Sequence, residues 1–208
     1  MVTVRIDLHA HLYDSYPLQA WCNAAARNLH IGPGVSGIVV VVDRAGQDSF
    51  QRFRDEVPSF GVWLEAKVQS PDNVSEAGML SWEGKTLLII RGVQYVSVER
   101  IEVLGLGVAR SVPDGAPLTE LVDLIRREDG IPCIPWSPGK WLGRRGQVIS
   151  RVMGSFSPGT LTFGDITIRS VLGPPSLLLQ RARKNRFAVL LGTDSLPRVQ
   201  DATLVALS

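Results

Sequence analysis

The sequence has few of the residues that characterise small secreted proteins or membrane proteins. Its 208 residues include two cysteines. Both Cys22 and Cys133 stand in apolar stretches without the spacing of a metal site, so we expect buried, reduced thiols. No apolar run approaches the roughly 18 residues of a membrane span, and no basic-then-apolar leader opens the chain. These absences argue against a disulfide-stabilised or membrane-spanning protein and favour a soluble, cytoplasmic one.

An excess of one charge sign is also missing. The chain has 22 Lys and Arg against 20 Asp and Glu, for a formal charge of +2. This near balance gives no sign of a nucleic-acid or membrane partner. With 45% hydrophobic residues, the chain is long enough for one domain with a sizeable core. We therefore predict a single domain over residues 1–208, and the composition leaves an oligomer open.

Short β-branched runs alternate with helix-like segments along most of the chain. Strands are predicted at 2–8, 36–43, 60–68, 86–98, 100–108, 131–136, 160–168 and 187–194, and helices at 17–29, 47–57, 117–129 and 175–186. This order favours a mainly parallel sheet with crossover helices. Seven or eight strands favour a distorted, TIM-like α/β barrel, although such barrels usually need about 250 residues. Residues 69–85 are polar and are predicted to be an excursion from the core.

Two of the three histidines of the chain stand in "DLHAH", at the end of the first predicted strand. Strand alternation would place Asp7, His9 and His11 on one face. Imidazole and carboxylate ligands suit zinc, manganese or iron, and Asp7 could instead fix a histidine tautomer. The alternative is a pair of structural histidines without an ion.

Other acidic residues stand where later strands end. Asp43 ends the second predicted strand and Asp194 the last one. Because chemistry in barrels gathers at the C-terminal ends of the strands, we expect both carboxylates at the same rim as His9 and His11. One divalent ion held by His9, His11 and Asp194 is the resulting prediction.

The "DLHAH" motif resembles the opening motif of the polymerase-and-histidinol-phosphatase (PHP) family of metal-dependent phosphoesterases, and also suits the broader amidohydrolase superfamily. The resemblance implies a distorted seven-stranded barrel that holds two or three metal ions. The order of later segments is similar across most of the chain, but only this first motif is close. The family positions that carry over are Asp7, His9, His11, Asp43 and Asp194.

Other residues occupy the remaining positions of the family pattern. Arg44 and Glu102 stand in place of histidines, Gln94 in place of a bridging glutamate, and Leu196 in place of a residue of the final motif. Two cations a few ångströms apart need an anionic bridge, and Gln94 is neutral. We therefore expect one ion, with Glu102 as a spare ligand, or none.

A glycine-rich, basic stretch follows the strand at 131–136. No acidic residue occurs from Trp136 through Gly164, and the basic residues there include Lys140, Arg144 and Arg145. A helical turn would put Lys140 and Arg144 on one face. Such side chains suit phosphate or carboxylate recognition, and the alternative is a solvated loop or a subunit contact.

These patterns predict a metal-dependent hydrolase of a phosphoester or an amide. The ion would activate a bound water, with Asp194 and Asp7 as catalytic carboxylates. The residues expected to bind a small anionic substrate are Arg44, Gln94, Lys140, Arg144, Arg145 and Arg169. The alternative is a non-catalytic barrel that binds an anionic metabolite or a partner protein, since cationic or neutral residues have replaced metal ligands.

Overall fold

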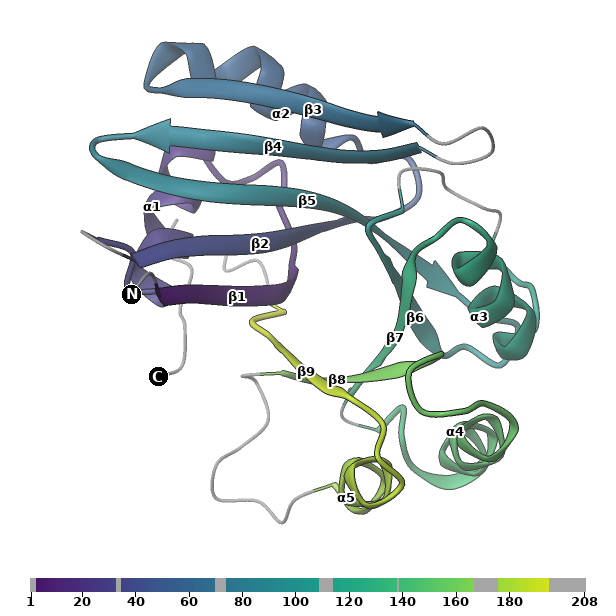
Figure 1. Cartoon of the computed structure of the whole chain (residues 1–208). Coiled ribbons are helices and arrows are strands. Elements are labelled where there is room, and N and C mark those ends of the chain that lie inside the picture. Colours follow the sequence, from purple (N-terminus) through teal and green to yellow (C-terminus); the bar gives the residue numbers. More distant parts are fainter. Residues whose placement is uncertain are drawn as a thin grey trace.

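The computed structural model describes residues 3–32, 35–69, 74–108, 114–137, 139–166 and 176–194. Within them, nine strands form one sheet, and seven of these follow one another around a nearly closed, barrel-like ring in the order β1-β2-β5-β6-β7-β8-β9 (Figure 1). The strands are β1 (Thr3–Ala10), β2 (Val35–Asp43), β3 (Val62–Gln69), β4 (Val74–Trp82), β5 (Lys85–Val96), β6 (Glu102–Leu106), β7 (Ile131–Pro135), β8 (Thr162–Ile166) and β9 (Val189–Gly192).

The strands of the ring do not all run in the same direction. β1, β2 and β5 are parallel neighbours, and so are β7, β8 and β9. β6 is antiparallel to both β5 and β7, because a short turn and not a crossover helix joins it to β5. The prediction of a mixed α/β, barrel-like sheet is confirmed in this coarse form, whereas a TIM-like barrel is not confirmed.

A hairpin of β3 and β4 branches from the ring at β5. The first half of β5 pairs with β4 and the second half pairs with β6, so both neighbours use the same edge of one long strand. The prediction of a polar excursion over 69–85 is therefore wrong for residues 74–82, which form β4. One buried position of β4 is Glu76, which forms an ion pair with Arg91. A charged residue at a buried position hides the alternation that marks a strand.

Five α-helices of the described residues cover the outside of the ring (Figure 1). They are α1 (Leu18–Asn28), α2 (Ser49–Glu56), α3 (Leu118–Arg127), α4 (Gly143–Ser155) and α5 (Leu177–Lys184). All except α4 fall where the sequence predicts a helix. α4 lies in the basic stretch, where its glycines weaken the helical pattern. No helix in the described part of the chain is long and apolar enough to cross a membrane.

Alternate residues of the strands point into the ring or toward the helices. Val40 and Val42 of β2 pack with Leu104 of β6 and Cys133 of β7, so they fill the interior of the ring. Val39 and its odd-numbered neighbours pack instead with residues of α1 and α2. This alternation decides which polar side chains of β2, β5 and β6 reach the interior and which reach the helices.

Candidate metal site

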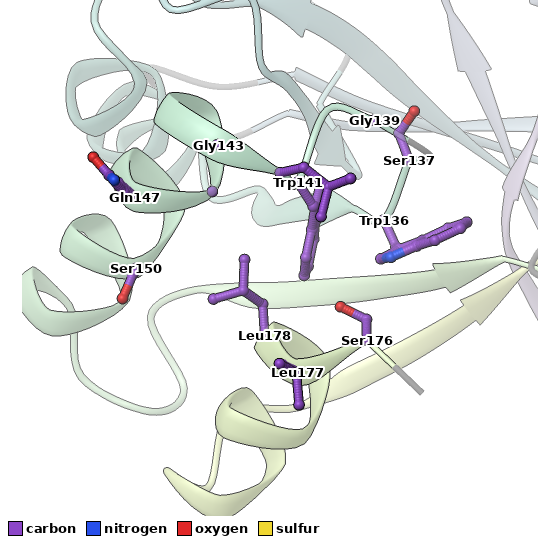
Figure 2. Close-up of a pocket in the computed structure, with 12 residues that line it drawn as sticks. Trp136, Ser137, Gly139, Trp141, Gly143, Gln147, Ser150, Ser176, Leu177 and Leu178 are labelled. Carbon is purple, nitrogen blue, oxygen red and sulfur yellow. The ribbon is translucent and has the colours of Figure 1, made fainter. Parts of the chain in front are cut away.

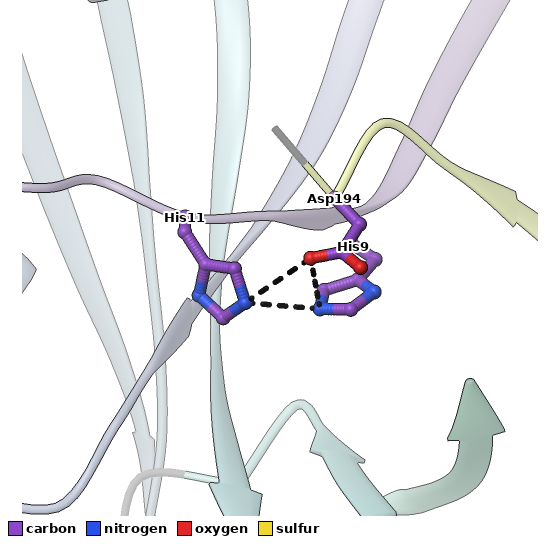
Figure 3. A group of neighbouring side chains, drawn as sticks. All are labelled: His9, His11 and Asp194. Atoms are coloured by element: carbon purple, nitrogen blue, oxygen red, sulfur yellow. Dashed lines mark hydrogen bonds and ion pairs between the residues drawn. The ribbon is translucent and has the colours of Figure 1, made fainter. Parts of the chain in front are cut away.

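Three side chains from the two ends of the chain meet at the carboxyl end of β1 (Figure 3). His9 and His11 lie at and just beyond the end of β1, and Asp194 follows β9. The two Nε2 atoms of the histidines lie 3.1 Å apart, and each lies 3.6 Å from Oδ1 of Asp194. The prediction that His9, His11 and Asp194 lie together is confirmed, and we call these residues the His-His-Asp group.

The spacing of these atoms fits a single metal ion. With ligand bonds of about 2.0–2.1 Å and tetrahedral angles, neighbouring ligand atoms lie about 3.3 Å apart. The three distances found differ from this value by only a few tenths of an ångström. Two imidazole nitrogens and one carboxylate oxygen are donors that zinc, manganese and iron sites share. The residues present therefore fit one divalent ion.

A bulge in β1 lies between Asp7 and Ala10, in the stretch that contains His9. β1 pairs with β2 residue by residue as far as Asp7 and Val39, but the next pair is Ala10 with Val41. One extra residue is therefore accommodated in β1, and bulges of this kind redirect side chains next to functional sites. The simple alternation expected from Asp7 through His11 does not hold across the bulge.

The tautomer of His11 is fixed by the neighbouring strand. Its Nδ1 lies 2.8 Å from the carbonyl oxygen of Val42, which can only accept a hydrogen bond. Nδ1 therefore carries the proton, and Nε2 presents its lone pair to the His-His-Asp group. Burial, together with the nearby His9, lowers the pKa of His11 to about 4. The ring is neutral near pH 7, as a metal ligand must be.

His9 completes the pair from a more enclosed position. Burial lowers its pKa to about 3, and the positive charge of Arg44 acts in the same direction. Because Nε2 of His11 is an acceptor, Nε2 of His9 donates the hydrogen bond that joins the rings when no ion is bound. To bind an ion through Nε2, His9 would shift its proton to Nδ1, a buried atom with no hydrogen-bond partner among the described residues.

Asp7 holds the backbone on both sides of the site. Its carboxylate accepts hydrogen bonds from the amide of His9 at 3.1 Å and from the amide and hydroxyl of Thr193 at 3.0 and 2.7 Å. The amide of Asp194 in turn donates to the carbonyl oxygen of His9 at 2.7 Å. Asp7 therefore positions the group, and its predicted catalytic role stays a prediction. Thr193 was not predicted as a functional residue, although its hydroxyl stands directly before Asp194 in the sequence.

Charged side chains surround Asp194. Burial raises the pKa of its carboxyl group, and Glu102 acts in the same direction, whereas His11, Arg44 and Lys140 lower it. Lys140 forms an ion pair with Oε1 of Glu102. Glu102 was expected as a spare ligand, but within the described residues the close cluster of potential ligands consists of His9, His11 and Asp194 alone.

Arg44 reaches the site through Tyr13, which the sequence analysis did not single out. The guanidinium donates to the Tyr13 hydroxyl at 2.9 Å and stacks over its ring at 5.1 Å. The Tyr13 and His11 rings lie 5.8 Å apart between centroids. Tyr13 stands two residues after His11, as His11 does after His9, and this spacing could have identified it. Arg44 thus lies next to the His-His-Asp group, while its substrate-binding role stays a prediction.

Asp43 does not join the group, contrary to expectation. It follows the outward alternation of Val39 and Val41, and its carboxylate pairs with Arg91 at 3.1 Å and accepts from the Ser49 amide. Asp43 therefore ties β2 to β5 and to the start of α2. Because successive side chains of a strand point to opposite faces, the outward position of Asp43 places the next residue, Arg44, beside the site.

The other predicted binding residues are spread more widely. Gln94 pairs with Leu104, so it shares the inward face of the sheet. Lys140 lies before the start of α4, so the predicted helical pairing of Lys140 and Arg144 is wrong. Arg144 is exposed on α4, and Arg145 donates to the Gly139 carbonyl. Arg169 lies outside the described residues. Binding roles for these side chains stay predictions.

Comparison with known proteins gives little to add to this geometry. No family model matches the sequence, and no curated protein matches it. Among solved structures, the chain is similar to the lesion-specific endonuclease PfuEndoQ from Pyrococcus furiosus, with a TM-score of 0.45 and 9% sequence identity. The similarity covers 93% of this chain and 48% of that one, so the chain spans about half the length of the endonuclease. The function of the chain is therefore inferred from its own residues.

Proposed function

We propose that this chain is a metal-dependent hydrolase that acts on an anionic substrate such as a phosphoester, with one zinc, manganese or iron ion held by His9, His11 and Asp194. The observation that carries the proposal is the spacing of 3.1, 3.6 and 3.6 Å between the three ligand atoms. Asp194 stands about 185 positions after the two histidines in the chain, and the fold brings the three together at the C-terminal end of parallel strands, where barrel enzymes carry their chemistry.

The chain's own residues have distinct parts in this proposal. A bound ion would supply Lewis acidity and lower the pKa of a water. Arg44 and Lys140 would attract the substrate anion and stabilise negative charge that develops on it. The free oxygen of Asp194 would accept a proton from the attacking water. Asp7 would keep Asp194 and His9 in place through the backbone contacts described above.

A second function is supported by the two cations beside the group. Arg44 and Lys140 are held by Tyr13 and Glu102 respectively, so they could bind an anion without any ion present. In that case the chain would be a non-catalytic barrel that binds an anionic metabolite.

Thermal unfolding with and without zinc and inorganic phosphate separates the two functions. The hydrolase proposal predicts that zinc raises the Tm, that phosphate raises it further only when zinc is present, and that a panel of phosphoesters contains a hydrolysed substrate. His11→Gln should abolish all three effects. Stabilisation by phosphate that ignores zinc, together with an inert panel, would favour the anion-binding barrel and contradict the hydrolase.

A further inference from the structure

A groove lies between α4 and α5, and the loop that carries Lys140 forms part of it. Figure 2 shows that the loop before α4 and the first turns of α4 form one wall, and that the start of α5 forms the other. Its volume is about 690 Å³, within the range of small-molecule sites. The lining residues that the structure describes include no charged side chain. The groove therefore suits an apolar occupant better than the anion expected at the neighbouring site.

Large apolar side chains gather at this groove although water reaches them. Leu142 is 72% exposed and Leu177 is 80% exposed, the two highest values among the large hydrophobic residues that the structure describes. Both line the groove together with Trp136 and Trp141. Trp136 is half-buried and Trp141 is buried, and exposed leucines beside aromatic rings are the composition of a ligand-binding surface.

The wall formed by the loop is firmly held. The Trp141 indole donates to the carbonyl oxygen of Pro135 at 2.9 Å, and its ring contacts Phe163 edge to face. Gly146 of α4 lies so close to the loop that a Cβ there would stand 2.4 Å from the Trp141 carbonyl oxygen. A glycine at this position lets the helix and the loop pack directly, so the shape of this wall is built into the fold.

The same loop joins the groove to the candidate metal site. Gly139 and Trp141 line the groove. Lys140 stands between them, forms an ion pair with Glu102, and lowers the pKa of the Asp194 carboxyl group through its positive charge. One side of this short loop therefore faces the anion site and the other faces the groove. A substrate with an anionic end and an apolar end could contact both sides at once.

We propose that the groove binds an aromatic or extended apolar group of the substrate, attached to the anionic group that the His-His-Asp group, Arg44 and Lys140 hold. This inference rests on the proposed function for the anionic half, and it narrows the substrate class to anionic esters of aromatic or bulky apolar alcohols. The flat ring of the half-buried Trp136 favours an aromatic group, because offset and edge-to-face ring contacts add to the gain from burial.

Calorimetric titration of the full chain in the presence of zinc tests the inference with two stable anions. 1-Naphthylmethylphosphonate should bind at least about tenfold more tightly than methylphosphonate. Leu177→Asp should remove this difference and leave methylphosphonate binding unchanged. The control is Leu64→Asp, which changes a leucine on β3 of similar exposure at 62%; it should leave both affinities as they are.

Two results would overturn the inference in different ways. Equal affinities for the two anions, or a naphthyl preference that Leu177→Asp retains, would show that the groove does not bind the apolar group. If phosphonate binding still depended on zinc, the hydrolase proposal would remain supported. The second result uses a neutral probe, 1-naphthylmethanol, in the same titration. It consists of naphthylmethanol binding that Leu177→Asp abolishes, while methylphosphonate does not bind with or without zinc. That result would remove both the link to an anion site and the proposed hydrolase.

Discussion

Gly192 lies against the backbone of His9 so closely that an added Cβ would stand 2.4 Å from the His9 Cβ and 2.8 Å from its amide nitrogen. This contact lies where β9 meets β1 and the ring nearly closes. It also sets the path of the two residues that follow, Thr193 and Asp194. The closure of the ring and the construction of the candidate metal site therefore depend on the same contact.

Replacement of Gly192 by alanine should disturb both. We expect Gly192→Ala to lower the free energy of unfolding by about 1–3 kcal/mol, as overpacking does, and to weaken zinc binding. The matched control is Gly154→Ala in α4, where an added Cβ would meet nothing within 4 Å; it should be neutral or stabilise by up to about 1 kcal/mol. Urea unfolding measures the free energy of unfolding of the two variants, and calorimetric titration measures their zinc binding. Equal stability of the two variants would contradict the proposed closure.

Loss of the Thr193 hydroxyl should leave the buried Asp7 carboxylate with one hydrogen bond fewer. We expect Thr193→Val to lower the free energy of unfolding by about 1–3 kcal/mol, and Thr193→Ser to retain most of it. Thr160 offers a control, because its hydroxyl donates an equally short bond of 2.7 Å at an exposed site. Thr160→Val should cost less than about 0.5 kcal/mol. A Thr193→Val variant as stable as Thr160→Val would show that Asp7 does not need this contact.

Asp43→Asn tests the departure from the PHP-like pattern. Asp43 pairs with Arg91 and not with the His-His-Asp group, so the substitution should leave zinc affinity within about threefold. It should nevertheless lower stability by about 1–3 kcal/mol, since a buried charge-assisted contact is lost. Calorimetry and urea unfolding give the two values. A large loss of zinc affinity with unchanged stability would indicate that Asp43 is a metal ligand.

The two buried thiols predict a fall of stability at alkaline pH. Burial raises the pKa of both Cys22 and Cys133 to about 12, from an ordinary value near 9. Between these values the unfolded chain releases thiol protons that the folded chain retains, so stability falls as the pH rises above about 9, by up to about 1.4 kcal/mol per pH unit and thiol. Cys22→Ala should reduce this slope in urea unfolding measured from pH 8 to 10. An unchanged slope would contradict a buried, protonated Cys22.

Residue patterns predicted the position of most strands and of four helices, because apolar periodicity records which side of each element is buried. They also identified His9, His11 and Asp194, because all three stand at the ends of predicted strands, where barrels gather their polar groups. The errors came from features without a periodic signal. The bulge in β1 breaks the alternation that Asp7 was expected to share, and the outward parity of β2 sends Asp43 toward Arg91. Glycines weaken the helical pattern of α4, and the buried Glu76 interrupts the apolar alternation of β4.

Zinc titration of the chelator-treated chain by calorimetry tests the central claim most directly. We predict one zinc ion per chain, with affinity reduced at least about 100-fold in His9→Gln, His11→Gln and Asp194→Asn, and unchanged in His30→Gln, which alters the remaining, exposed histidine. Each variant should keep the circular dichroism spectrum of the parent chain. Absence of zinc binding, or binding that all three ligand variants retain, would contradict the site.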